Sequence, residues 1–332
     1  MDSTSSATVE PLLAFELLAD HSGRPAALLL HLDPPSGAHL PGALSTPEFQ
    51  RIRTDLPCLY IDPGESGLSP EMAAALARSG FEPTSSLEVH RAREADFSAV
   101  SVHARWIGGN WFLNPPAKAD PRTGASRAST LHLLQLVSAD APTRDIETVF
   151  KREPALSYHL LRLVNSVGVG TGRRITSLSQ AIMILGRQQL RRWLNLLLFA
   201  AREDDPRTQM LLARAVCHAR LLELLAQETG YDKAAQDQAF MTGLFSLLGI
   251  LFGLPLEDVI EPLSVSEGVR AALLRHEGEL GRHLDLADAA LHGDLNRIAA
   301  ELRRNALSST SFNILQIQAI SWMRDVLRPG GA

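Results

Sequence analysis

The chain has 332 residues, 45% of them hydrophobic, so its length and composition predict about two folded domains and argue against a disordered chain. It carries 32 Lys and Arg against 37 Asp and Glu, a formal net charge of −5. This balance argues against non-specific nucleic-acid binding, which needs a basic surface. The two cysteines, Cys58 and Cys217, lie far apart in the sequence and are expected to be reduced thiols.

The N-terminal segment MDSTSSATVEP has neither a basic start nor an apolar run, so no signal peptide is predicted. The longest apolar stretch, residues 240–256, has the length of a buried helix and falls short of the ~20 residues that span a membrane. We therefore expect a soluble, cytoplasmic protein with no membrane span.

Short apolar runs alternate with turn signals through residues 1–113. LLAFELLA and AALLLHL flank the turn-like DHSGRP; the first run fits either a helix or a strand, and the second fits a strand better. EMAAALAR predicts a helix that ends at Ser79-Gly80. Further strands are expected at 58–61, 87–89 and 99–102. The alternation predicts an α/β module.

Residues 114–129, NPPAKADPRTGASRAS, are rich in Pro, Gly, Ala and charge and are interpreted as a linker. Helical spacing dominates the rest of the chain, so residues 130–330 are expected to form an all-α domain and the whole protein an α+β fold. The helices predicted outside its central segment are 142–151, 208–228, 235–252, 259–263, 267–275, 280–292, 295–305 and 312–327.

The centre of that domain, residues 152–200, predicts three helices joined by two breaks. Pro154 suits a first helical position, and the glycines of VGVGTG (167–172) end the first helix. Ser177 and Gln180 have the spacing of a capping box, and Gly186 marks the end of the second helix. The third helix, 187–200, becomes apolar nearly all round, which is typical of a buried helix.

The run EPALSYHLLRLVNSVGVG with ITSLSQAIMILGRQQLRRWLNLLL resembles the core of an HDOD domain. The sequence similarity continues through residues 239–260 and 271–294, so the resemblance covers roughly residues 125–330. HDOD domains are helical relatives of the HD and HD-GYP metal-dependent phosphohydrolases that have lost the catalytic ligands. LSYHLLRLVNS and LGRQQLRRWLNLLL are also similar to the bacterial signalling subgroup with a degenerate EAL domain before the HDOD domain.

The N-terminal part carries a weaker resemblance to EAL domains. Phe15-Glu16-Leu17-Leu18 is similar to their first strand, whose glutamate binds the metal for cyclic di-GMP hydrolysis, and 107–116 is similar to the segment that closes their fold. A complete barrel takes ~200 residues, and no counterpart of the acidic strand end or the catalytic lysine is found here. The resemblance therefore implies a shortened, degenerate module in which Glu16 is vestigial.

HD phosphohydrolase chemistry needs an adjacent His-Asp pair with further His and Asp ligands to hold the metal that activates water. No His-Asp dipeptide occurs in the chain, and Ser246-Leu247 stands at the position that the resemblance implies. His218 lies where such relatives have an early ligand and is interpreted as a vestige. The remaining histidines lack metal-site spacing. We expect no catalytic residue, no metal and no cofactor.

A basic patch precedes and opens the third central helix. As an anion or nucleotide contact it would use the helix N-terminus; as an ordinary solvated face it would pair with nearby acids. A helix–Gly–helix also imitates a DNA-reading motif, but residues 193–199 are too apolar to enter a groove, so DNA is not expected. The patch consists of Arg173, Arg174, Arg187, Gln188, Arg191 and Arg192.

The turn Arg275-His276-Glu277-Gly278 matches the HEG-like turn of the family. Gly278 is expected to break one helix, with the neighbouring polar groups capping its end and the start of the next. The alternative is that His276 and Glu277 contact a ligand or partner. VGVGTG lacks the Lys and Ser/Thr of a phosphate loop and is interpreted as a connection.

These features favour a non-enzymatic bacterial signalling regulator that binds another signalling protein. Two alternatives stay open at this point. One is a receptor that binds cyclic di-GMP or another nucleotide without cleaving it, and the other is a metal-dependent phosphodiesterase with an unusual site. A half-barrel would leave strand edges that the helical domain or a second chain, as in a homo-oligomer, must cover.

Overall fold

The computed structural model describes residues 10–32, 40–98, 100–114, 132–152, 154–166, 175–200 and 205–328. Six short strands form one mixed sheet in the order β4-β3-β2-β1-β6-β5. β1 pairs antiparallel with β2 and β6, whereas the pairs β2–β3, β3–β4 and β5–β6 are parallel. The strands are β1 (Leu13–Ala19), β2 (Pro25–Leu32), β3 (Cys58–Ile61), β4 (Glu82–Thr84), β5 (Val89–Arg91) and β6 (Trp106–Gly108).

The first apolar run, which fitted either a helix or a strand, is strand β1. It turns back into β2 through residues 20–24, where Asp20 Oδ1 accepts hydrogen bonds from the backbone N–H of Ser22 and Arg24 and Gly23 has φ +74°. Such side-chain-to-backbone bonds are typical of a turn begun by Asp. β1 is buried at every position except Glu16, which is half-buried, so both of its faces pack against other elements.

Other expectations for the N-terminal module are met unevenly. The strand at 58–61 is confirmed as β3, and the helix EMAAALAR is confirmed as α3 (Pro70–Arg78). The strand expected at 87–89 begins later, as β5. The strand expected at 99–102 is wrong for the described residues 100–102, of which 100 and 101 are irregular and 102 is in a turn. Two helices without a strong apolar period were not anticipated: α1 (Pro47–Asp55) and α2 (Pro63–Ser66).

All regular elements described after residue 131 are helices. A helical segment at 132–138 precedes the named helices, and the boundaries expected for 208–228 and 267–275 are confirmed. The predicted helix 235–252 is divided at Ser246-Leu247. The helices are α5 (Thr143–Arg152), α6 (Pro154–Ser166), α7 (Leu178–Ala200), α8 (Thr208–Glu228), α9 (Lys233–Phe245), α10 (Leu248–Phe252), α11 (Leu256–Ile260), α12 (Glu267–Arg275), α13 (Gly278–Leu291), α14 (Leu295–Arg304) and α15 (Ser309–Leu327).

The breaks predicted in the central segment are present where it is described. Gly186 interrupts α7 with φ +73° and ψ +166°, so the helix from 187 to 200 is separate, and residues 193–200 are all buried. Ser177 Oγ accepts the Gln180 N–H, and Gln180 Oε1 accepts the N–H of Thr176, one residue before the position of a standard capping box. Residues 167–174, residues 1–9 and all of the expected linker 114–129 except Asn114 lie outside the described residues.

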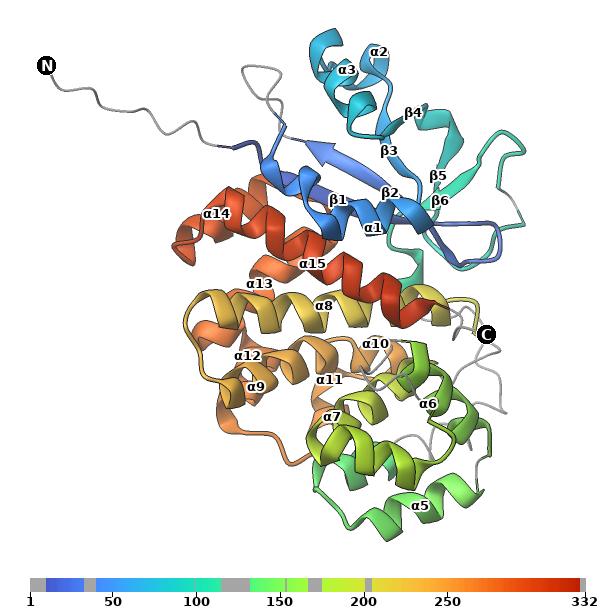
Figure 1. Cartoon of the computed structure of the whole chain (residues 1–332), viewed down its shortest axis with the longest axis vertical. Helices are drawn as coiled ribbons and strands as arrows, with labels where there is room; N and C mark the ends of the chain where they lie inside the picture. The colour runs from blue at the N-terminus through green and yellow to red at the C-terminus, as the bar shows by residue number, and fades with distance from the viewer. Residues whose placement is uncertain are drawn as a thin grey trace, which may run out of the picture.

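α15 joins the sheet to the other helices. Figure 1 shows it beneath β1 and α1, with α8 on its other side. The Asn313 amide donates to Pro11 O at 2.9 Å and accepts the Leu13 N–H at 3.0 Å, and Gln316 donates to Leu13 O at 2.8 Å. β6 reaches β1 only at Ala19, so the start of β1 is an open edge. Buried amides of α15 cover that edge, as one of the two expected solutions requires.

The opposite end of α15 holds α1. Arg324 Nη1 donates to Arg51 O at 2.6 Å and lies 3.3 Å from the Asp55 carboxylate, and Arg328 donates to the same carboxylate at 2.7 Å. Apolar residues of β1, α1, α8 and α15 share one continuous core. Both cysteines are free thiols, as expected. None of the described helices is long and apolar enough to span a bilayer.

Candidate functional site

His218 ties three helices together at the position where the sequence suggested a lost ligand. It lies on α8 and is buried. Its Nδ1 is 3.0 Å from Ser246 Oγ and 3.2 Å from Gly243 O, both at the end of α9, and its Nε2 is 3.2 Å from Asp288 Oδ1 on α13. The structure therefore brings together His218 and Ser246, which the sequence singled out, and adds Asp288, which it did not.

The remaining residues of this cluster leave little for a metal. Leu247 is 5% exposed and contributes only apolar surface. Asp285, one turn before Asp288, lies 2.9 Å from His276 Nδ1, 3.7 Å from Arg297 and 3.8 Å from Arg304. Both carboxylates thus face cationic or N–H-donating groups. Among the described residues no group of three or more His, Cys, Asp or Glu is arranged to hold a metal ion.

The pKa of Asp288 reflects these neighbours. Burial raises it, but the hydrogen bond and charge of His218, with the charges of His276 and Arg297, outweigh burial and lower the pKa below its ordinary value. A carboxylate whose negative charge is already balanced gains less from a cation than a free carboxylate does. The cluster at His218 therefore works as a structural junction of α8, α9 and α13.

The turn at His276 has a local role that differs in detail from the expected one. His276 ends α12 with φ +54°, and Gly278 begins α13 with φ +74°. Glu277 makes no side-chain cap bond; it pairs with Arg275 at 3.0 Å. The His276 side chain bonds Asp285, and its backbone N–H caps the end of α12 by donating to Ala272 O at 3.1 Å. His276 and Glu277 are exposed, so they remain candidate partner contacts.

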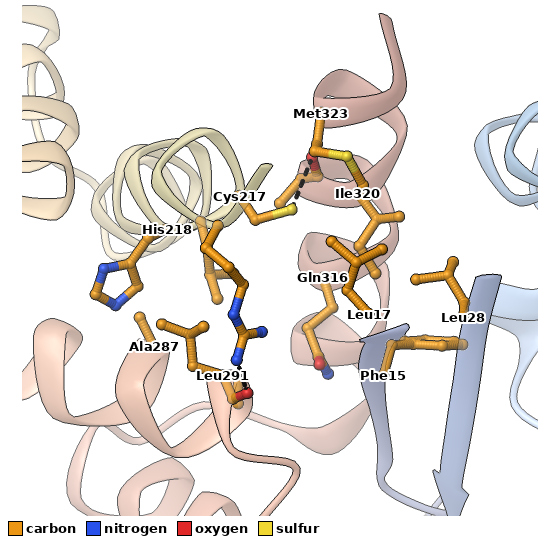
Figure 2. Close-up of a pocket in the computed structure, with 14 residues that line it drawn as sticks. Phe15, Leu17, Leu28, Cys217, His218, Ala287, Leu291, Gln316, Ile320 and Met323 are labelled. Atoms are coloured by element: carbon orange, nitrogen blue, oxygen red, sulfur yellow. Dashed lines mark hydrogen bonds between the residues drawn. The ribbon is translucent and has the colours of Figure 1, made fainter. Parts of the chain in front are cut away.

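A small cavity lies between the sheet and the helices. Figure 2 shows His218 and Cys217 of α8 on one side, Phe15, Leu17 and Leu28 of β1 and β2 on the other, and α15 beside them. Its volume of about 50 Å³ is far below the roughly 300 Å³ of a typical small-molecule site, so a nucleotide does not fit. Arg214 lines the cavity, donates to Leu291 O and keeps its charge at neutral pH, although burial lowers its pKa to about 10.

A larger groove runs along α9, between α7 and α12. We call it the α9 groove. Its volume of about 400 Å³ falls within the range of small-molecule sites. Three members of the predicted basic patch, Gln188, Arg191 and Arg192, line it, together with other polar and apolar side chains. Its lining includes Ser138, Gln188, Arg191, Asp237, Met241 and Phe245.

Arg192 of the basic patch is engaged by acidic residues of α8 and α9. Arg192 points inward, pairs with Asp237 and with Glu223 at 2.9 Å, and stacks 4.4 Å over the Phe240 ring. Burial raises the pKa of Glu223, but the hydrogen bond and charge of Arg192 and the neighbouring Arg220 bring it below its ordinary value. The interpretation of the patch as a solvated face predicted that Arg192 is exposed and pairs with acids. Arg192 does pair with acids, but it is not exposed.

Of the other members of the patch, the structure describes the side chains of Gln188 and Arg191 only. Arg191 lines the α9 groove and makes no hydrogen bond or ion pair with any residue in the described part of the chain, and Gln188 is exposed at the rim. Arg173 and Arg174 lie outside the described residues, and the side chain of Arg187 is likewise not described. Arg191 therefore gives the groove a cation that has no acidic partner among the described residues.

Glu16 forms a third polar centre, within the sheet. Its carboxylate pairs with Arg91 of β5, lies 3.1 Å from His31 Nε2 of β2 and accepts the Gly109 N–H at 2.9 Å. Burial raises its pKa, but the bonds from His31 and Arg91, the Arg91 charge and the Gly109 N–H lower it to about 2. Glu16 is therefore a structural link between β1, β2 and β5–β6, with its charge balanced.

Replacing Glu16 with glutamine is expected to destabilise the fold by up to about 3 kcal/mol, since each pKa unit corresponds to about 1.4 kcal/mol. The folded pKa is depressed from 4.5 to about 2, so this stabilisation is present above pH 4.5 and is lost as the pH falls from there toward 2. Urea unfolding at pH 7 and pH 3 measures both effects.

Glu48→Gln is the control for this substitution, because Glu48 forms a surface pair with Arg51 that contributes less than about 1 kcal/mol. Equal losses for Glu16→Gln and Glu48→Gln at pH 7 would contradict the role given to Glu16.

Sequence reasoning missed the acidic members of these sites. Asp285 and Asp288 lie three residues apart on one face of α13, a spacing that could have indicated a shared site. Asp237 lies four residues after Lys233, which reads as an ordinary surface pair. Their partners come from distant helices, and spacing along one helix does not reveal them.

Comparison with protein families matches residues 128–284 to the HDOD domain. The chain is 27% identical over 242 residues to "Cyclic di-GMP phosphodiesterase CdgJ" of Vibrio cholerae, covering 73% of this chain and 54% of that protein. It is 29% identical over 191 residues to "Uncharacterized protein YuxH" of Bacillus subtilis, covering 57% and 46%. The chain thus spans about half the length of both curated relatives.

Among solved structures, a putative phosphohydrolase from Shewanella amazonensis aligns with a TM-score of 0.41 and 13% identity, covering 60% of this chain and 93% of that one. The family comparison agrees with the helical architecture from residue 132 onward and with the motifs read from the sequence. Residues 128–284 of this chain form an HDOD domain.

Proposed function

We propose that this protein is a non-enzymatic signalling regulator that acts by binding another signalling protein. The observation that carries the proposal is the state of the His218 cluster. Leu247 is buried where the resemblance implies an aspartate, and Asp285 and Asp288 are each held by groups from neighbouring helices. Metal-dependent hydrolysis needs a cation held by free ligands beside an open position for water.

The N-terminal module is, in this proposal, the remnant of an EAL-like domain. The two segments that carry this resemblance meet in space, because Glu16 of β1 accepts a hydrogen bond from Gly109 just after β6. Arg91 and His31 occupy the remaining positions around the carboxylate. Glu16 then contributes to the sheet and not to metal binding.

The relative from Vibrio cholerae bears a name that connects it with cyclic di-GMP, which favours a place in cyclic di-GMP signalling for this chain. A helical scaffold that keeps its core without the catalytic ligands is most simply explained by binding, although a fold alone does not determine a function. The exposed His276 and Glu277 turn offers one polar surface for a partner.

Titration of the purified protein with Mn²⁺ and Mg²⁺ by calorimetry tests this proposal. We expect no saturable heat at micromolar metal, and no stoichiometric metal in the protein purified without chelators. Tight binding of one metal ion that is lost in Asp288→Asn would contradict the proposal. The thermal unfolding of Asp288→Asn must be measured beside it, because this substitution also removes the contact with His218.

A further inference from the structure

The α9 groove combines the features of a ligand site that the proposed function leaves unused. Met241 and Phe245 supply apolar surface from α9, and Arg191 supplies a cation from α7. Asp237 lies one helical turn before Met241 on α9 and contributes a carboxylate. A mostly apolar pocket with a few placed polar groups is the usual form of a small-molecule site.

Buried polar atoms at the groove lack partners among the described residues. Ser138 is 8% exposed, lines the groove, and its Oγ has no hydrogen-bond partner. Asp237 Oδ1 is held by Arg192, whereas the buried Asp237 Oδ2 is unpaired. Buried polar groups in native proteins are nearly always hydrogen-bonded, so such atoms around a cavity indicate where a bound molecule supplies the missing bonds.

The geometry points to a guanine nucleotide as the ligand of the α9 groove: we propose that Asp237 accepts an N–H of the base and Arg191 binds the phosphate. Phe245 and Met241 then supply apolar contacts for the ring, and the Ser138 hydroxyl is available for a base or sugar oxygen. The pairing of Asp237 with Arg192 fixes the carboxylate in position and leaves its second oxygen for the ligand.

Charge and donor pattern decide between the bases. A carboxylate oxygen is an acceptor only, and guanine presents two adjacent N–H donors on one edge. Adenine presents an acceptor nitrogen at the corresponding position, which a carboxylate repels. Arg191 has no other partner among the described residues, so its charge is available for phosphate, which arginine binds through charge-assisted hydrogen bonds.

This inference deepens the proposed signalling role by giving the domain a ligand. The shared chemistry, a guanine ring with a phosphate, could come from a cyclic dinucleotide or from a mononucleotide. Calorimetric titration of the full chain with cyclic di-GMP, GMP, cyclic di-AMP and AMP separates the sources. We expect saturable binding of at least one guanine ligand and at least tenfold weaker binding of its adenine counterpart.

Variants locate the binding site. Arg191→Ala is expected to weaken guanine-nucleotide binding at least tenfold, whereas Arg144→Ala, an exposed arginine on α5, should leave it unchanged. Asp237→Asn should reduce the preference for guanine over adenine. Because Asp237 also pairs with Arg192, the unfolding midpoint of the Asp237→Asn variant is measured in parallel. If that variant is unstable, the comparison of Arg191→Ala with Arg144→Ala decides the test.

Three results would overturn the inference: no guanine ligand binds at millimolar concentration, adenine ligands bind equally well, or Arg191→Ala and Arg144→Ala behave alike. None of these results touches the claim that the protein is not a hydrolase. Conversely, turnover of cyclic di-GMP would overturn the proposed function even if the groove binds the nucleotide.

Discussion

Gly243→Ala is expected to destabilise the protein by about 3 kcal/mol, although Gly→Ala inside a helix normally stabilises by up to about 1 kcal/mol. Gly243 lies where α9 crosses α8. A Cβ added there would lie 2.8 Å from Ala219 Cα and 2.8 Å from His218 O, both backbone atoms that cannot rotate away. Relief of this contact would move α8 away from α9 and separate His218 from Ser246.

Denaturant unfolding measures the effect, with Gly268→Ala as the control. Gly268 is near the start of α12, and a Cβ there meets nothing within 4 Å, so its replacement should be neutral or slightly stabilising. The free energy of unfolding should be lower for Gly243→Ala than for Gly268→Ala. A neutral or stabilised Gly243→Ala protein would show that the α8–α9 contact is looser than the structure indicates.

Asn313→Leu is expected to destabilise the protein by roughly 2–5 kcal/mol, because it leaves two backbone groups of the N-terminal strand without partners. Asn313 is fully buried, and its amide both donates to Pro11 O and accepts the Leu13 N–H. Leucine has a similar volume, so the loss reports mainly the hydrogen bonds and not a cavity.

The expected consequence is local as well as global. With the edge of β1 uncovered, limited proteolysis should cut near residue 10 at a concentration that leaves the native protein intact. Gln318→Leu, at a half-buried position of the same helix, is the control and should be within about 0.5 kcal/mol of the native protein. Equal behaviour of the two variants would mean that α15 does not secure the N-terminal module through its amides.

The sequence predicted the long helices well because their apolar spacing extends over several turns. The helix at 208–228 and the break at Gly186 are confirmed. Three-residue strands such as β4 and β6 were missed, since a run that short has no measurable period. The strand expected at 99–102 rested on Val100 and Val102, and Val102 is exposed in a turn. Its β propensity is not supported by any neighbouring strand.

The site could be predicted only in part. His218 and Ser246 were identified from the resemblance and do meet, at 3.0 Å. Asp288, which pairs with His218, and Asp285, which pairs with His276, both come from α13. These contacts could be found only in three dimensions. Within the basic patch, Arg191 and Arg192 are adjacent in sequence but lie about 100° apart around the helix axis, so their partners differ. Both line the α9 groove, but only Arg192 pairs with Glu223 and Asp237 among the described residues.

We propose that this chain, with Leu247 buried and its carboxylates paired, has no metal-dependent phosphodiesterase activity. The most direct measurement is chromatographic detection of products from cyclic di-GMP incubated with the repurified full chain and Mn²⁺ or Mg²⁺. We expect cyclic di-GMP to remain intact over many hours, whether or not it binds. Steady formation of linear product, by an activity that copurifies with the protein and is lost in Asp288→Asn, would contradict this proposal.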